Sequence, residues 1–442
     1  MKKLNFIIKC GLALLLLSFY SCESWLNVTP SDRLSEEMLF NDREGFVKAL
    51  NGVYIELNTN ELYGRNLTAG ALDVMGQYYS VASSSHAFYN YGGLVYTGND
   101  EKALFDNMWQ KCYAVIACCN TIIEKCDENK AGLSPVWRGS IKGEALALRA
   151  MLHFDMLRLF GPLTSELDKE SIPYQTNSDQ TVTPLLSGSE VVGLILDDLK
   201  NAVGLLKDTD PYFVEEEFSD TDLNYRRFRM NYFAAKGLMA RVQLWGGDKE
   251  KAAATAKEVI AEGQAEGAEF FPFVTNSEAT SSNPDRVFYS EVLFGTYHSS
   301  REKLHEDLFA PTLESTSILT LAGTARRDDL YDNENDYRYS VWSTYNKNGT
   351  SVLYHRKFEK QDNVTASRQY MIPLIRMSEM YLIAVECCKL DEASVYLNTF
   401  RNARNCNSLA LTEDNRINIL ANEYKKEMLG EGQLFFFYKR QE

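Results

Sequence analysis

The sequence predicts a mainly α-helical fold, in which helical hairpins of the tetratricopeptide type stack into a superhelix with long loop insertions and a few short strands. Apolar residues recur every three or four positions in at least four hairpin segments, which places them along one face of each helix. The small residues Ala240 and Ala252 stand at a spacing that is typical of tetratricopeptide hairpins. A single hairpin cannot bury its apolar face alone, so about four such units are expected to stack.

The clearest hairpin covers residues 229–263. Gly246 and Gly247 are expected to end its first helix, because glycine readily adopts the left-handed cap. Asp248 is expected to cap the second helix by accepting hydrogen bonds from its free amide groups. Small residues at Ala240, Ala252 and Ala256 allow the two helices to approach closely.

Further helical patterns lie on both sides of this hairpin, at residues 43–57, 101–127, 143–162, 189–207, 374–404 and 417–428. His153 lies on the apolar stripe of the third, so we interpret it as a packed core histidine; no nucleophile pattern accompanies it. Cys112, Cys119 and Cys126 repeat at seven-residue steps, which favours buried thiols over a metal site.

Three stretches break the helical period. Residues 58–100 are rich in glycine, serine and tyrosine and predict a long loop. Residues 286–297 (RVFYSEVLFGTY) favour a short strand. Residues 326–354 are polar and aromatic and are expected to form another loop.

The amino terminus is typical of an export signal. Lys2 and Lys3 precede an apolar run that is too short to span a bilayer comfortably, and Ser21-Cys22 follows it. A cysteine at this point predicts lipidation at Cys22, with residues 1–21 removed and residues 22–442 forming one mature domain. A plain secretory signal is the alternative.

Composition excludes several classes of function. The net charge of −15 argues against a nucleic-acid partner. The chain has no H-E-x-x-H zinc motif, no G-x-S-x-G nucleophile elbow and no phosphate-binding glycine loop, and no pair of carboxylates stands out as a glycosidase pair. We therefore expect no enzyme activity, no cofactor and no metal.

Taken together, six segments resemble the SusD/RagB family of outer-membrane nutrient-binding lipoproteins of Bacteroidetes. They occur in the family's order from end to end: Cys22, LNVTPSDRLSEEMLFNDREGFVKALNGVY, GEALALRAMLHFDMLRLFGP, NYFAAKGLMARVQLWGGD, IRMSEMYLIAVE and EYKKEMLGEGQLFFFYKR. The chain departs from the family in two ways. Only Glu23 supplies acid directly after Cys22, and the chain ends at FFFYKRQE, where similar proteins usually continue into a proline-rich tail.

The resemblance implies a lipid-anchored protein on the outer membrane, facing the cell exterior and serving as the surface lid of a SusC-like TonB-dependent transporter. Capture of an oligosaccharide and its delivery to that transporter is the leading hypothesis. Peptide capture by the same lid mechanism is the alternative, because the family includes peptide-uptake members. An intracellular interaction scaffold would suit the helical repeats, but the export signal argues against it.

Recognition is expected to fall to the loops, because the helical faces are committed to stacking. Aromatic faces stack on the apolar C–H faces of sugar rings, while tyrosine and tryptophan rims form hydrogen bonds. Trp342 is the leading candidate, and Asp73 and Arg65 are the nearest polar partners for hydroxyl groups. The full set of expected ligand-binding residues is Arg65, Asp73, Tyr78, Tyr79, Tyr89, Tyr91, Tyr297, His298, Tyr337, Tyr339 and Trp342.

Overall fold

The structure, a computed structural model, describes residues 36–179, 181–267 and 269–442. The predicted signal segment and Cys22 therefore lie outside the described residues. The main helices are α3 (Arg43–Leu57), α6 (Asn99–Glu128), α7 (Pro135–Phe160), α8 (Gly188–Thr209), α10 (Tyr232–Trp245), α11 (Lys249–Gly263), α16 (Met377–Cys387), α17 (Leu390–Asn402), α18 (Glu413–Glu427) and α19 (Gln433–Gln441). Shorter helices are α2 (Glu36–Leu39), α4 (Ala71–Met75), α5 (Tyr89–Gly92), α9 (Asp220–Asn224), α12 (Asn276–Thr280), α13 (Arg301–Leu308), α14 (Thr324–Leu330) and α15 (Ala366–Tyr370).

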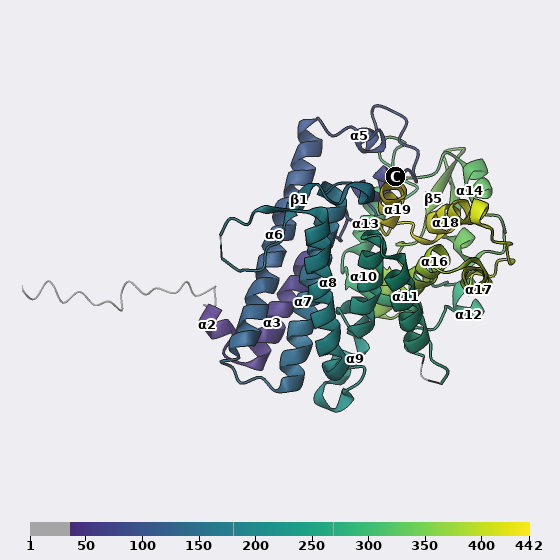
Figure 1. Ribbon diagram of the computed structural model, residues 1–442. Coiled ribbons are helices and arrows are strands. Elements are labelled where there is room, and N and C mark those ends of the chain that lie inside the picture. The colour runs from purple at the N-terminus through teal and green to yellow at the C-terminus, as the bar shows by residue number, and fades with distance from the viewer. Residues whose placement is uncertain (1–35, 180, 268) are drawn as a thin grey trace, which may run out of the picture.

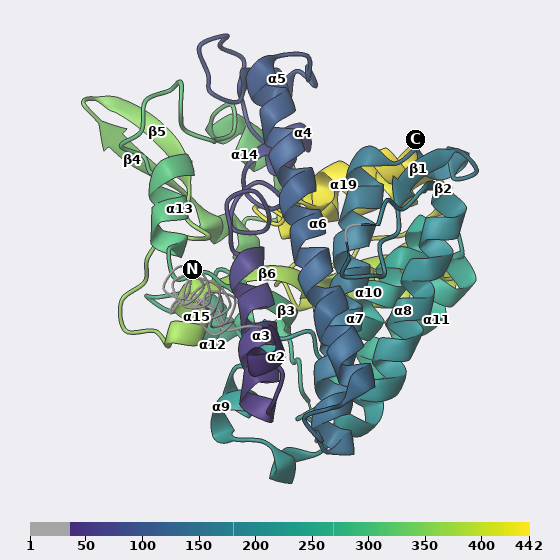
Figure 2. The same cartoon turned by 90° about the vertical axis from the view of Figure 1, so that its left-hand side faces the viewer.

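Eight of the helices form one continuous stack. In the order α3, α6, α7, α8, α10, α11, α16 and α17, each helix packs against the next. Figure 1 shows this row of helices from α6 to α17, and Figure 2 shows α3 at its edge beside α6. Eight helices make four pairs, so the predicted mainly helical fold with about four stacked units is confirmed.

The α10–α11 hairpin follows the predicted local chemistry. Gly247 has φ +83° and closes α10 in the left-handed conformation. The Asp248 side chain accepts a hydrogen bond from the amide of Lys251 at 3.0 Å and caps α11. Ala240, Ala252 and Ala256 are completely buried, as expected at the points where helices cross closely.

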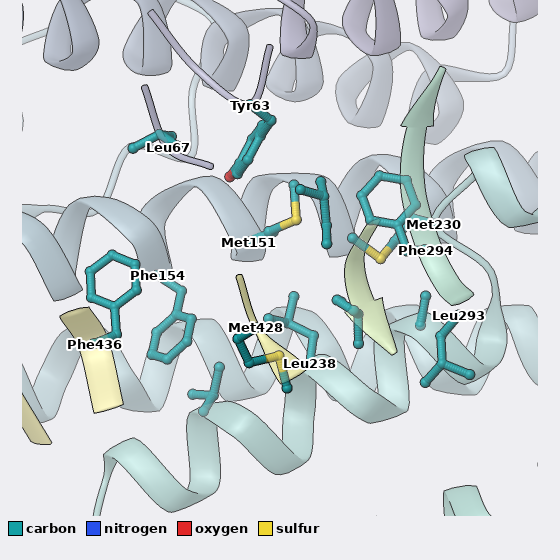
Figure 3. Close-up of a cluster of buried hydrophobic side chains, with 14 of the residues drawn as sticks. Tyr63, Leu67, Met151, Phe154, Met230, Leu238, Leu293, Phe294, Met428 and Phe436 are labelled. Carbon is teal, nitrogen blue, oxygen red and sulfur yellow. The ribbon is translucent and has the colours of Figure 1, made fainter. Parts of the chain in front are cut away.

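The core lies between the helical stack, strand β3 and the carboxyl-terminal region. Figure 3 shows Met151 and Phe154 of α7 and Leu238 of α10 beside Leu293 and Phe294 of the strand β3 (Val292–Tyr297). All five side chains are buried. Met428 and Phe436 from the carboxyl-terminal region enter the same cluster, so the end of the chain packs against the repeats.

Two antiparallel strand pairs follow the α10–α11 hairpin in the chain, and the first of them packs against α10. Strand β3 pairs with β6 (Met371–Arg376), and β4 (Trp342–Lys347) pairs with β5 (Thr350–His355). A third small pair joins β1 (Glu170–Pro173) to β2 (Leu185–Ser187). Figure 2 shows β4, β5, α13 and α15 gathered away from the helical stack.

Two local predictions are wrong. Residues 374–376, read as the start of a helix, end strand β6 instead, because they pair with β3. Residues 326–354, read as a loop, contain α14, the 3-10 helix η6 (Tyr337–Val341) and the β4–β5 hairpin. The hairpin turns at Asn348 and Gly349, whose φ values of 52° and 88° suit a tight two-residue turn.

A buried ion-pair network ties the carboxyl-terminal helices to this strand side. It contains six cations, Arg338, Lys357, Arg376, Arg401, Arg404 and Lys426, and six anions, Glu291, Asp332, Asp336, Glu423, Glu427 and Glu431. Glu427 lies at its centre and contacts Arg338, Arg376 and Arg404. Asp332 is exposed at the edge of the network, and the other eleven groups are buried. The equal numbers of opposite charges allow so many ionised groups to be buried together.

The two predicted core features are confirmed. His153 is fully buried, with Nδ1 3.0 Å from the carbonyl oxygen of Arg149 and Nε2 accepting from the amide of Gln175 at 3.0 Å. Burial lowers the pKa of His153 to about 3, so the ring is neutral. Cys112, Cys119 and Cys126 are buried thiols.

Candidate functional site

The fold brings the predicted loop stretches into contact. The amide of Ser80 donates to the carbonyl of Thr320 at 2.8 Å, and the Thr320 hydroxyl donates to the carbonyl of Leu353 in β5 at 2.6 Å. His298, which follows β3, lies with Nε2 3.1 Å from the carbonyl of Gly64. The segments around 64–80, 298 and 320–353 therefore lie against one another.

Most of the predicted side chains in the first loop hold that loop in place. Asp73 is fully buried and accepts hydrogen bonds from the amides of Gly430 and Gly432 at 2.6 and 2.9 Å and from the Tyr79 hydroxyl at 3.1 Å. The Tyr78 hydroxyl donates to the carbonyl of Tyr424 at 3.1 Å. These contacts join α4 to the carboxyl-terminal segment, and they occupy groups that we expected to meet a ligand.

Trp342 is also placed differently from the expectation. It begins β4, is only 4% exposed and packs edge-on against His355 with ring centroids 5.3 Å apart. The sequence reading of a tryptophan among polar residues failed because alternation in the strand turns this one ring inward. Tyr91 and His298 are buried as well.

The remaining predicted residues are more accessible but scattered. Tyr89 is 42% exposed at the start of α5. Arg65 is half-buried, with its guanidinium 5.8 Å from the ring centroid of Phe88. Tyr339 is half-buried and donates to Asp328 at 2.8 Å, and Tyr337 packs beside Phe288. Tyr297 is half-buried and lies in a cavity.

That cavity, the aromatic groove, has a volume of about 450 Å³ and runs beside α3. Helix α3, the 3-10 helix η4 (Arg226–Phe228) with its flanks, and the end of β3 form its walls. Its lining residues are Asn51, Tyr54, Ile55, Asn58, Tyr225, Phe228, Arg229, Thr296 and Tyr297. Of the predicted site residues, Tyr297 alone belongs to this lining.

The aromatic rings of the groove are held by neighbours behind them. Tyr297 contacts Phe228, Tyr225 and Tyr370, with ring centroids 5.2, 6.1 and 5.1 Å away. Tyr225 is 38% exposed and lines the groove, so part of its side chain is open to solvent. Such rings offer flat apolar faces that are already ordered before a ligand arrives.

The opposite wall is fixed by a buried carboxylate. The Tyr54 hydroxyl donates to Glu144 at 2.6 Å and accepts from the amide of Met230 at 2.8 Å. Arg229 donates from Nε to Glu144 at 3.0 Å, and its guanidinium lies 4.4 Å from the centroid of the Tyr54 ring. Burial alone would raise the pKa of Glu144, but Arg229 and Arg226 lower it below its ordinary value, so the carboxylate stays charged and holds both side chains.

The apolar lining of the groove also contains a few polar side chains. Neither Asn58 Oδ1 nor Thr296 Oγ1 has a hydrogen-bond partner among the described residues. Asn51 and Arg229 add an amide and a guanidinium at the rim. An apolar cleft with a few polar groups is the usual form of a small-molecule site.

A second cavity, of about 200 Å³, continues the groove. It shares Asn51, Tyr225 and Arg229 with the groove and extends toward Trp137 and Phe218. The Trp137 and Phe218 rings lie 4.6 Å apart. The two cavities together give a longer surface with aromatic rings at both ends.

Tyr225 and Phe228 escaped the sequence analysis because they lie between the helical pattern at 189–207 and the hairpin at 229–263, in a stretch to which it assigned no element. Their position opposite β3 arises only from tertiary packing. Arg226 holds η4 opposite β3, because it donates to Asp210 at 3.0 and 2.7 Å and forms an ion pair with Glu144. A local signal was present in the aromatic residues at positions 225 and 228, three apart in the chain.

The described residues contain no group of three or more His, Cys, Asp or Glu arranged to hold a metal ion. Among the described helices, none combines the length and the apolar character that crossing a membrane requires.

Comparison with family models gives two matches. Residues 24–244 match a model described as starch-binding associating with outer membrane, and residues 282–442 match the model of the SusD family.

Curated relatives match part of the chain. SusD-like protein P2 of Formosa agariphila is 25% identical over 265 residues, which cover 58% of this chain and 46% of the relative. SusD-like protein P38 of the same organism is 27% identical over 199 residues, which cover 41% of this chain and 34% of the relative. The chain thus aligns with less than half the length of these relatives.

Solved structures share the fold. A SusD-like carbohydrate binding protein from Bacteroides vulgatus superimposes with a TM-score of 0.71 at 22% identity, covering 91% of this chain and 84% of the other. A laminarin binding SusD-like protein superimposes with a TM-score of 0.64 at 17% identity, covering 91% of this chain and 92% of the other.

Proposed function

Because the chain belongs to the SusD/RagB family, we propose that it is a non-catalytic binding protein that captures an oligosaccharide in the aromatic groove and delivers it to a SusC-like TonB-dependent transporter. Two proteins that share this fold, one a carbohydrate binding protein and the other a laminarin binding protein, support a glycan as the ligand class. The groove is the observation that carries the proposal for this chain.

The groove suits a sugar for physical reasons. A pyranose presents C–H groups on its faces and hydroxyl groups around its edge, so it needs flat apolar walls with polar groups between them. Tyr225 and Tyr297 supply the faces, while Asn51 and Arg229 supply an amide and a guanidinium at the rim. The continuation toward Trp137 favours a ligand longer than one sugar ring.

The site contains no arrangement for bond cleavage. Its carboxylate, Glu144, is buried behind Tyr54 and bonded to that hydroxyl, to Arg226 and to Arg229. A glycosidase needs two carboxyl groups on either side of the scissile bond, about 5 Å or more apart. The lining of the groove contains no aspartate or glutamate. Its continuation is lined by Glu144 and by Asp222, and Asp222 accepts from the amide and the hydroxyl of Ser219 at 3.0 and 2.7 Å in the cap of α9. Both carboxylates are thus engaged in structural contacts, which supports binding without catalysis.

The remaining parts of the proposal follow from the family. A lipid on Cys22 would anchor the protein to the outer membrane facing the exterior, and the protein would then serve as the lid of its transporter. In mild detergent, a TonB-dependent transporter encoded beside this gene should co-purify with the full-length protein. Its absence from the purified complex would contradict the lid role.

A binding panel tests the ligand class and the site together. The mature protein is titrated with neutral and acidic oligosaccharides and with peptides, and the strongest ligand is measured by calorimetry. Tyr297→Ala and Tyr225→Ala should each weaken binding at least tenfold, or about 1.4 kcal/mol. Tyr345→Ala is the matched control, because Tyr345 is 45% exposed on β4 outside the groove.

The outcomes separate the two ligand classes. Binding of a glycan that depends on Tyr297 supports the proposal. Binding of peptides alone would assign the protein to peptide uptake. Equal loss of affinity in Tyr345→Ala, or no loss in the two groove variants, would place the site elsewhere.

A further inference from the structure

Four arginines converge where loops meet beside α13. Arg286 precedes the 3-10 helix η5 (Tyr289–Glu291), Arg301 begins α13, Arg356 follows β5 and Arg368 lies in α15. Figure 2 shows α13 and α15 on the side of α3 opposite the helical stack. Arg301 is 1% exposed and Arg286 is 7% exposed, so at least two of these guanidinium groups are buried.

Two carboxylates face this cluster. Glu359 accepts from Arg356 Nε at 2.8 Å and lies 3.5 Å from an Arg286 nitrogen. Asp285 lies 3.7 Å from Arg368 Nε, but its oxygens already accept from the amides of residues 287, 288 and 289 at 2.8–3.1 Å. Four cations thus face two anions, whereas the network around Glu427 has six of each.

The hydrogen bonds of the cluster are also incomplete. The Nε atoms of Arg286, Arg301 and Arg368 are buried and have no acceptor among the described residues. The Arg301 guanidinium donates from Nη1 to the carbonyl of Met371 at 2.9 Å. A buried charged donor without an acceptor is costly, and an unseen ion is one of its ordinary explanations.

A buried Nε without an acceptor does not by itself indicate an anion site, because Arg65, Arg227 and Arg416 also have one. The buried arginines of this cluster differ in lying close enough to repel each other. Burial, together with the neighbouring arginines, lowers the pKa of Arg301 to about 9 and that of Arg286 to about 10. Convergence, excess positive charge and three free donors together distinguish the cluster.

We propose that Arg286, Arg301 and Arg368 bind a small inorganic anion of the size of chloride or sulfate. Planar guanidinium groups are the usual protein donors to such ions. The burial of Arg286 and Arg301 excludes a bulky ligand and favours an ion that becomes enclosed as the loops fold.

A chain of contacts links the site to one end of the aromatic groove. Arg301 binds the carbonyl of Met371, the amide of His298 binds the carbonyl of Tyr370 at 2.8 Å, and the Tyr370 ring contacts Tyr297. The anion therefore fastens α13 and α15 behind the groove wall. This role goes beyond sugar binding and does not depend on it.

Thermal unfolding of the mature protein tests the proposal. Sodium gluconate is replaced by sodium chloride or sulfate at constant ionic strength, and the wild type should show a saturable rise in Tm of about 3 °C. Arg301→Met should abolish the anion-dependent difference. Arg326→Met changes an exposed arginine of α14 and should retain the anion-dependent difference in Tm. This control also shows how much of the difference is a general salt effect.

A second measurement does not require the variant to fold. Crystals of the wild type soaked in bromide should show an anomalous peak among the three guanidinium groups. The proposal is overturned if the peak is absent there, or if folded Arg301→Met responds to chloride and sulfate as the wild type does.

Discussion

Replacing Glu427 with glutamine should destabilise the protein more than any surface change of the same kind. Glu427 is fully buried and pairs with Arg404 at 2.7 Å, with Arg338 at 3.1 Å and with Arg376. Glutamine keeps the size of the side chain but removes the charge, which leaves the six cations of the network facing five anions. Removing one partner of a buried pair typically costs about 3–5 kcal/mol.

The expected shift in melting temperature follows from the size of the protein. Unfolding entropy of about 2.1 cal/mol/K per residue gives about 0.8 kcal/mol/K for roughly 400 residues, so a loss of about 4 kcal/mol lowers Tm by about 5 °C. Differential scanning calorimetry measures it directly. Glu413→Gln is the matched control, because Glu413 lies exposed on the same helix, paired with Arg416.

The pH dependence gives the prediction a second signature. Burial alone would raise the pKa of Glu427, but Arg404 and Arg376 hold it well below its ordinary value of 4.5. A carboxyl whose pKa falls on folding stabilises the protein above its unfolded pKa, and this contribution is lost as the pH drops through the folded value. The gap between wild type and Glu427→Gln should therefore be widest near pH 7 and narrow below pH 4.5. A Tm within 1 °C of the Glu413→Gln control would refute the reasoning.

Three further changes test the fold and the anchor. Ala240→Leu places a larger side chain at a fully buried helix crossing and should cost about 1–3 kcal/mol in urea unfolding; an unchanged midpoint would contradict the packing of α10. Trp342→Ala should lower the free energy of unfolding by about 3–5 kcal/mol because the ring is buried. An unchanged Tm together with lost ligand affinity would instead support the original expectation that Trp342 binds the ligand. Cys22→Ala should abolish incorporation of radiolabelled palmitate, and equal labelling of variant and wild type would exclude lipidation at this residue.

The helical scaffold was predictable because its signal is local. The apolar residues from Ala235 to Trp245, the glycines after them and the Asp248 cap all act within one or two helical turns. The structure has α10, its end and the cap of α11 at these positions. The β4–β5 hairpin was missed although Asn348-Gly349 is a strong turn signal. Its strands carry too few apolar residues to show a period of two, so the turn alone had to reveal them.

The candidate site was predicted only in part, because it depends on contacts between distant segments. Tyr297 was expected from its place after a strand, but Tyr225 and Tyr54 join it only through folding. Asp73 was read as a ligand contact, whereas residues more than 350 positions away occupy its oxygens. The sequence of a polar loop does not distinguish a residue that binds a ligand from one that holds the loop.

A crystal structure of the mature protein with its strongest oligosaccharide ligand tests the central claim most directly. The account predicts a sugar ring stacked on Tyr297 or Tyr225, at about 4 Å from the ring atoms, with hydroxyl groups directed to Asn51 or Arg229. Sugar density over Tyr89 or Tyr345, with the groove beside α3 filled only by water, would contradict it.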